Sequence, residues 1–208
     1  MKIASLKPTQ WFPGQNVSVK PHLRGWIHLV AAPLSLAASI VLTCLAPTGA
    51  TKGGSAIYLA ASLILFGISA LYHRFYWSPR WEVVWNRLDH SNIFLLIAGT
   101  YTPLSIAILP HDQAVTILSI VWGGALLGIL LNLFWPTAPR WLATLIYVAL
   151  GWVALWYLPQ FWALGGAVIV WLLLAGGILY TLGAVVYATK KPDLSPRWFG
   201  FHEIFHLC

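Results

Sequence analysis

The sequence predicts an all-α membrane protein, a bundle of seven transmembrane helices with a cytoplasmic N-terminus. Three observations lead to this fold class. The composition is 59% hydrophobic and only 8% charged, with a mean hydropathy of +0.76, whereas soluble domains carry roughly 25% charged residues. Apolar runs long enough to cross a hydrocarbon core of ~30 Å recur along the chain. Basic residues gather in alternate connecting loops.

Each apolar run of about 20 residues is interpreted as one membrane-spanning helix. Connectors rich in proline and polar residues separate the runs, and these residue types end helices. The expected spans are residues 26–46, 55–76, 88–109, 114–134, 141–158 and 161–188, followed by a truncated seventh helix at 199–208, within which the sequence stops. Residues 1–25 are polar and lack the apolar core of a cleavable signal peptide. We therefore expect a cytoplasmic tail (1–25) and one transmembrane domain (26–208).

The charges of the loops predict the orientation. Eleven of the twelve Lys and Arg residues fall in the tail and in the second, fourth and sixth loops, and Lys52 alone falls on the other side. Since basic loops stay in the cytoplasm, the tail and these loops are expected there. The net charge of +7 then reflects topology and attraction to anionic lipid. No soluble basic domain is present, so nucleic-acid binding is excluded.

Tryptophan and cysteine agree with a membrane protein. Seven of the 13 tryptophans lie near the ends of the expected spans, where amphipathic rings anchor at the headgroup level. Cys44 lies deep in the first span and Cys208 in the last. They are expected to be incidental thiols, because two such cysteines do not make a disulfide framework.

Polar groups inside the spans are few, and they share one membrane level. Such groups are costly in lipid and usually mark function. His73 ends the second span, Asp89 begins the third, and His202 and His206 begin the seventh, all at the cytoplasmic face. Ser69 lies one turn before His73 on the same helix face. The orientation came from loop charge alone, so this agreement in depth is independent evidence for a site.

The residue types in this group are typical of a zinc centre. His202 and His206 are four residues apart, so one helix face presents both imidazoles to a single ion. With His73 they supply three of four tetrahedral ligands and leave one position open, a pattern more typical of catalytic than of structural zinc sites. Asp89 would contact the bound water or serve as general base. Ser69 would donate to a developing oxyanion.

Other interpretations stay open at this point. His202 and His206 with Glu203 between them also match the H-E-x-x-H pattern of zinc proteases, in which the glutamate is the base. Those enzymes take a third ligand downstream, so this version would be an intramembrane protease with an upstream ligand. Otherwise Glu203 is expected to pair with Arg197 or Arg74.

The remaining histidines and Ser69 also have structural interpretations. His28 and His90 are expected to be hydrogen-bonded core residues, and His22 and His111 to lie in solvent-side loops. The Ser69 hydroxyl could bond back to a carbonyl of its own helix.

Four segments carry a resemblance to a known family: Ser69–His73 (SALYH), Leu88–Phe94 (LDHSNIF), Ala98–Pro103 (AGTYTP) and His202–His206 (HEIFH). Together they closely resemble the hemolysin III family, the bacterial branch of the progestin and adipoQ receptors, over most of the chain from about Arg24 onward. The combination of S-x3-H, D-H and H-x3-H is specific.

The resemblance implies a multi-pass protein of the bacterial inner membrane with seven helices. It implies a zinc ion near the cytoplasmic face, bound by His73, His202 and His206, with Asp89 nearby through water. Relatives grouped with the alkaline ceramidases carry the same Ser, Asp and His set and hydrolyse lipid amides. The first expectation is therefore a zinc-dependent hydrolase of a lipid amide or ester, with membrane lipid as its partner.

The alternative is a pore-forming or receptor-like membrane protein with a structural zinc. A continuous polar pore would need polar residues through the outer halves of several spans, and those halves are mainly Ala, Leu, Ile and Val. Two departures from the family pattern are visible. Many members carry an acidic residue ahead of the first span, where this chain has Arg24, which argues against a role for the tail. The family's seventh helix also continues well past H-x3-H.

Overall fold

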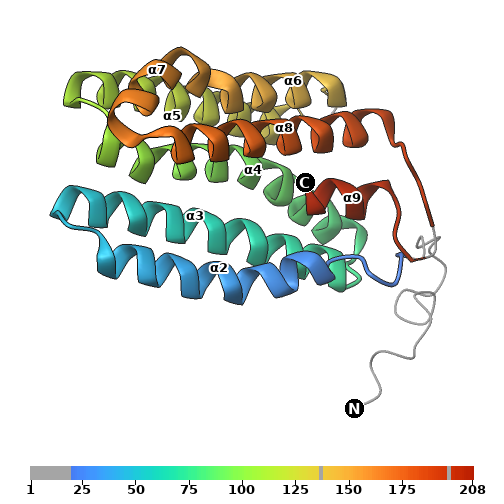
Figure 1. The fold of residues 1–208 in the computed structure, drawn as a ribbon. Coiled ribbons are helices and arrows are strands. Elements are labelled where there is room, and N and C mark those ends of the chain that lie inside the picture. The colour runs from blue at the N-terminus through green and yellow to red at the C-terminus, as the bar shows by residue number, and fades with distance from the viewer. Residues whose placement is uncertain (1–19, 136–137, 196–197) are drawn as a thin grey trace.

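The computed structural model describes residues 20–135, 138–195 and 198–208, and these form a bundle of helices (Figure 1). The elements are α2 (Trp26–Leu45), α3 (Gly49–Arg74), α4 (Pro79–Ile108), α5 (His111–Phe134), α6 (Arg140–Gly151), a 3-10 segment η2 (Trp152–Tyr157), α7 (Leu158–Gln160), a π segment η3 (Phe161–Gly165), α8 (Ala167–Thr189) and α9 (Phe201–Leu207). No strand occurs among the described residues.

Six helical stretches of the described chain are long and apolar enough to span a membrane, the fifth running from Trp141 to Gly165. The seventh, α9, is short. The predicted all-α membrane bundle is thereby confirmed, and the chain is a multi-pass integral membrane protein. Which end of the bundle faces the cytoplasm stays a prediction from the loop charges.

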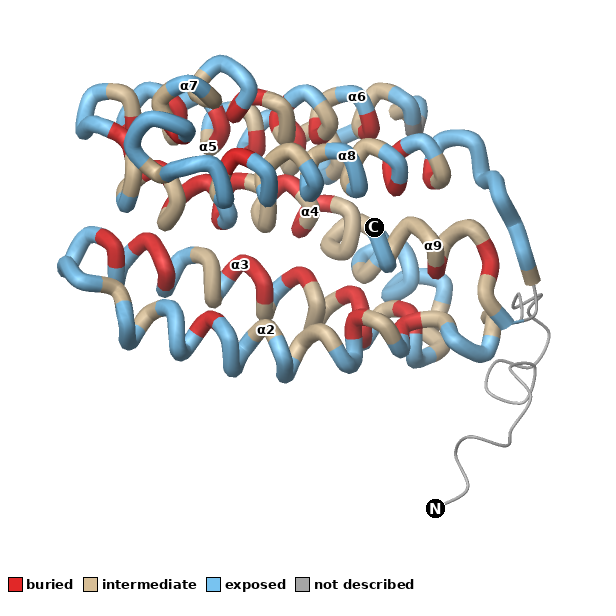
Figure 2. Tube along the Cα trace, in the orientation of Figure 1, coloured by how far each residue is buried: buried red, intermediate tan, exposed pale blue. Residues whose placement is uncertain are grey.

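Exposed residues lie along the outer sides of the helices and most buried residues lie on the sides that face other helices (Figure 2). Large hydrophobic side chains such as Leu172 and Val168 on α8 are exposed, as expected for helices that face lipid. Phe94, Ile117 and Phe161 are fully buried and belong to one core shared by α4, α5, η3 and their neighbours. The helices from α4 to α8 therefore pack around one apolar core, and large hydrophobic side chains on the outside of the bundle are left to face the membrane.

Helix starts differ from the expected spans where local caps extend a helix beyond its apolar run. α3 begins at Gly49, ahead of residue 55, because Thr48 and Thr51 form a reciprocal capping box. α4 begins at Pro79, nine residues ahead of residue 88, with proline in the first turn, where its missing N–H costs nothing. This early start makes α4 the longest helix and brings Asp89 into its body.

The boundary between the fifth and sixth spans was predicted wrongly. The expected fifth span ended at residue 158 and the sixth began at residue 161, so the connection between them fell on Pro159 and Gln160. Pro159 instead lies in the first turn of α7, where proline is tolerated. The chain turns at Gly166, whose φ of +84° favours glycine.

Tyr101 supports the irregular stretch before that turn. Its hydroxyl donates to the Gly151 carbonyl at 2.7 Å and accepts from the Ala154 N–H at 2.9 Å. These two bonds replace backbone pairing where α6 changes to the 3-10 segment. The hydropathy of the sequence does not reveal such a tertiary contact.

The last helix lies beside the first part of the described chain. α9 packs against α8 and against α2, and Figure 1 shows it at the end of the bundle where α2 begins and α3 ends. Segments far apart in sequence therefore meet at this one end of the bundle.

Candidate metal centre

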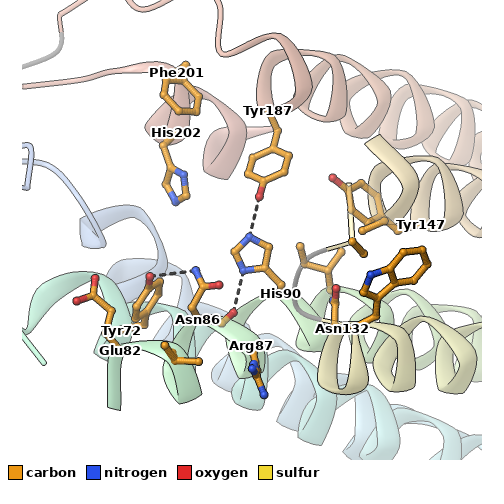
Figure 3. Close-up of a pocket in the computed structure, with 15 residues that line it drawn as sticks. Tyr72, Glu82, Asn86, Arg87, His90, Asn132, Tyr147, Tyr187, Phe201 and His202 are labelled. Atoms are coloured by element: carbon orange, nitrogen blue, oxygen red, sulfur yellow. Dashed lines mark hydrogen bonds between the residues drawn. The ribbon is translucent and has the colours of Figure 1, made fainter. Parts of the chain in front are cut away.

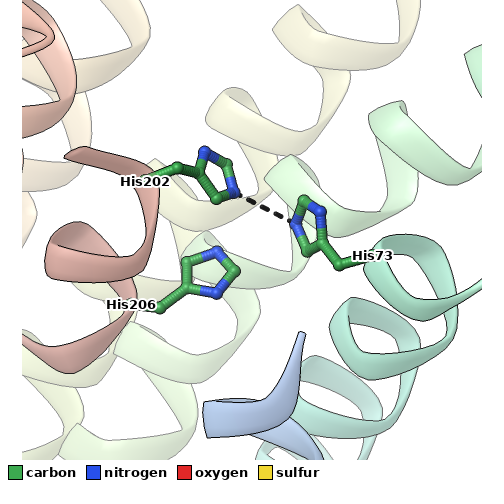
Figure 4. A group of neighbouring side chains, drawn as sticks. All are labelled: His73, His202 and His206. Atoms are coloured by element: carbon green, nitrogen blue, oxygen red, sulfur yellow. Dashed lines mark hydrogen bonds between the residues drawn. The ribbon is translucent and has the colours of Figure 1, made fainter. Parts of the chain in front are cut away.

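Three histidines from two helices face one another at this end of the bundle (Figure 4). His73 lies in the last turn of α3 and is 5% exposed, and His202 and His206 project from α9. One ring nitrogen of each lies within 4.8 Å of those of the other two. The structure thus brings together all three imidazoles that the sequence proposed as ligands.

The spacing of these nitrogens fits a zinc ion. His202 Nε2 and His73 Nε2 are 3.2 Å apart, and two nitrogens on one tetrahedral zinc, each at ~2.05 Å, are about 3.3 Å apart. The ring centroids of the three pairs are separated by 4.4–4.9 Å. Three neutral imidazoles are also a donor set that zinc prefers.

Asp89 and Ser69 complete the polar group around His73. Asp89 Oδ2 lies 3.4 Å from His73 Nε2, and the aspartate side chain is 11% exposed. Ser69, one turn before His73, is 1% exposed. The Ser69 hydroxyl has no well-aligned hydrogen-bond partner among the described residues, but it lies close enough to the Asp89 carboxylate to interact with it. All five residues that the sequence proposed for the site therefore lie together.

Glu203 has a different partner from either of those expected. It is 1% exposed, its Oε1 pairs with Arg24 Nε, and its Oε2 accepts the Gly200 N–H at 2.8 Å. Arg74 lies instead over the Trp26 ring, and Arg197 falls outside the described residues. Arg24 precedes α2, so the end of the expected tail contacts α9, a contact that the sequence did not predict.

His28 was missed as a neighbour of the site. It stacks on His206 with ring centroids 4.0 Å apart and an interplanar angle of 6°. His28 is buried, as expected of a core histidine, although its Nδ1 has no hydrogen-bond partner among the described residues. A signal was available, since His28 begins the first span at the same predicted membrane level as His73.

The expectations for the other histidines hold in part: His90 is hydrogen-bonded but, at 29% exposed, is not a core residue, and His111 is the first residue of α5 rather than a loop residue. His90 Nδ1 donates to the Asn86 carbonyl at 2.8 Å, and its Nε2 accepts from the Tyr187 hydroxyl at 2.7 Å. His22 and His111 are exposed. Both cysteines are free.

The sequence of the chain matches a known protein family. The sequence model of the family described as "Haemolysin-III related" matches residues 17–208, which include every residue of the site. The chain belongs to the haemolysin-III family. It is 35% identical over 188 residues to "Hemolysin-3" of Bacillus cereus, covering 86% of this chain and 80% of that protein.

A second relative supports the same family assignment. The chain is 35% identical over 147 residues to "Hemolysin-3 homolog" of Bacillus subtilis (strain 168), covering 70% of this chain and 68% of that protein. The family resemblance drawn from the sequence motifs is therefore confirmed. No solved structure matches the chain.

In this haemolysin-III family member a cavity of about 770 Å³ adjoins His202 of the three-histidine group (Figure 3). His202 forms part of its wall, and the His90–Tyr187 pair lies across it. Polar side chains from several helices line it, including Glu82, Asn86, Arg87 and Asn132. The volume is within the range typical of small-molecule sites, and the polar lining suits a hydrophilic group.

Proposed function

We propose that this haemolysin-III family member binds one zinc ion through His73, His202 and His206 and hydrolyses an amide or ester bond of a membrane lipid. The observation that carries the proposal is the group of three imidazole nitrogens within 4.8 Å, with a carboxylate oxygen 3.4 Å from one of them. When bound, zinc would supply a Lewis acid and a nucleophile at neutral pH.

The protein residues have separable tasks in this proposal. Asp89 lies against the His73 nitrogen and is largely buried, so it is positioned to take a proton from the attacking water. Ser69 has a buried hydroxyl that makes no hydrogen bond of normal geometry to the described residues. In the proposed reaction it would turn from the Asp89 carboxylate to donate to the oxygen on which negative charge develops.

The surroundings favour a lipid substrate. The polar cavity beside His202 can hold a headgroup, and the exposed outer faces of the helices are apolar. A second, mainly apolar cavity of about 330 Å³ lies among α4, η2 and α8. A molecule with a polar head and an aliphatic tail matches these surroundings better than a fully soluble substrate does.

The test uses the full chain purified in detergent without a chelator. We expect about one zinc per chain in the wild type, loss of zinc in His202→Ala, and retention in His111→Gln, which alters an exposed histidine away from the site. Asp89→Asn should keep zinc and lower ceramide or lysolipid hydrolysis about 10²–10⁴-fold. Metal content is measured by mass spectrometry and hydrolysis by product analysis.

Two outcomes would contradict this proposal in different ways. A metal-free wild-type protein overturns the zinc site. Zinc retained by a wild type that cleaves nothing on a broad lipid panel overturns the enzyme, and favours a structural zinc in a receptor-like or lytic protein. Release of dye from lipid vesicles by that same preparation separates the lytic version from the receptor-like one.

A further inference from the structure

Residues 20–28 touch both of the helices that carry the three imidazoles; we call this segment the strap. At one end of the strap, Lys20 Nζ donates to the Tyr72 and Phe75 carbonyls, each at 2.8 Å. These carbonyls flank His73 at the C-terminal end of α3, where unpaired carbonyls attract cations. The strap is therefore fixed to the helix that bears the first imidazole.

The middle of the strap is fixed to the α9 region. Arg24 pairs with the buried Glu203, and the Leu23 N–H donates to the Trp198 carbonyl at 3.3 Å. The second carboxylate oxygen of Glu203 accepts the Gly200 N–H, which caps the first turn of α9. A single side chain thus joins the strap to the start of the helix that bears the other two imidazoles.

The far end of the strap contacts a proposed ligand directly. His28 stacks on the His206 ring, and it is itself packed edge-on against Phe66 of α3. Glu203 and His206 are three residues apart, so they share one face of α9. That face is the one that the strap covers.

The contacts of the strap orient α9 (Phe201–Leu207), the helix that carries two of the three imidazoles. Imidazole ligands must be oriented by their neighbours to bind metal well. Glu203 lies between the two histidines in sequence, but both of its oxygens are already engaged by Arg24 and Gly200.

We propose that the strap positions His202 and His206 through the Arg24–Glu203 pair and the His28 stack, and that Glu203 is a positioning residue for the metal site. This inference rests on the proposed zinc site. It also means that the segment ahead of the first span controls how tightly the metal is held.

The experiment compares Arg24→Gln, Glu203→Gln, the double variant and Arg24→Lys. Glutamine at 203 can still accept the Gly200 N–H, so only the charge is removed. Each glutamine variant should weaken zinc binding about 10–100-fold, measured by competition with a chelator, and Arg24→Lys should recover part of that loss. The double variant should be weakened by less than the product of the two single effects, since each single change leaves one buried charge unpaired.

Matched controls remove exposed charges elsewhere. Arg80→Gln at the same end of the bundle and Asp112→Asn at the other end should leave zinc affinity unchanged. A base role for Glu203 predicts the reverse pattern, with hydrolysis lost and zinc affinity intact in Glu203→Gln. The positioning role of the strap is refuted if the single variants bind zinc as tightly as the wild type does. It is also refuted if the loss of affinity in the double variant equals the product of the two single losses.

A second measurement separates this inference from the zinc site itself. Hydrogen exchange of the α9 amides in metal-free protein should be faster in each single glutamine variant than in the wild type, at equal global melting temperature. If the wild type binds no zinc but its α9 amides exchange more slowly than those of the glutamine variants, the proposed function is refuted and the positioning role of the strap is supported. If exchange is unchanged, the strap fails whatever the metal content.

Discussion

The close contact between α3 and α4 allows a sharp test of the packing, through Gly99→Ala. A Cβ added at Gly99 would lie 2.6 Å from the Ala61 Cβ, whereas carbon atoms in contact are ordinarily about 3.5–4.0 Å apart. The Ala61 methyl is fixed to the α3 backbone and cannot rotate away. The two helices would have to separate by roughly 1 Å.

We expect this substitution to destabilise the protein. Because the Ala61 methyl cannot move away, the overpacking should cost about 2–3 kcal/mol, the upper part of the usual range, and the higher helix propensity of alanine returns ~1 kcal/mol. The net loss of about 1–2 kcal/mol corresponds to a fall in melting temperature of roughly 2–8 °C for a chain of this size. Thermal unfolding in detergent, followed by circular dichroism or tryptophan fluorescence, measures it.

A compensating change makes the test specific. In Gly99→Ala with Ala61→Gly the methyl group crosses the interface, and its next neighbours, the Ile57 carbonyl and the Tyr58 Cα, are at an ordinary 3.8 Å. The double variant should therefore melt close to the wild type. Gly67→Ala on α3, where an added Cβ meets nothing within 4 Å, should not be destabilised. A stable single variant, or a double variant no better than the single, would refute the packing described here.

Two further predictions concern a buried hydroxyl and a buried lysine. Tyr101→Phe removes the acceptor for the buried Ala154 N–H and should cost about 1–3 kcal/mol of unfolding free energy; Tyr58→Phe should cost nothing measurable, and equal melting temperatures for the two would contradict the bond. Burial lowers the pKa of Lys20 from 10.5 to about 8. Because the unfolded chain binds more protons than the folded one between pH 8 and 10.5, the free energy of unfolding should rise with pH in that window. Lys20→Met should lack this rise. If the unfolding free energies of the wild type and of Lys20→Met change with pH in parallel, the lowered pKa of Lys20 is contradicted.

The sequence predicts membrane depth well, since hydropathy and loop charge both report where a residue lies along the bundle axis. Depth alone grouped His73, Asp89, His202 and His206, and the structure places these side chains together. Their role as zinc ligands and base stays a prediction. Hydropathy does not indicate which residues of neighbouring helices face one another. The stacking of His28 on His206 and the Arg24–Glu203 pair were therefore not predicted.

The turn at Gly166 was misplaced for a related reason. The apolar composition continues unchanged from α7 into α8, so hydropathy does not mark the reversal. Proline draws attention as a helix breaker, yet Pro159 is accommodated in a first turn. The 3-10 segment that precedes this stretch is held by the Tyr101 hydroxyl, which comes from a helix about 50 residues earlier in the chain.

The meeting of α9 with the start of α2 has a consequence for biosynthesis. Arg24 and Glu203 are 179 residues apart in the sequence, and all six helical stretches that can span the membrane lie between them. The segment ahead of α2 can therefore meet α9 only after those six stretches have been synthesised and inserted. The group of side chains at this end of the bundle thus assembles late, and any fault in the insertion or packing of an intervening helix would also disturb it.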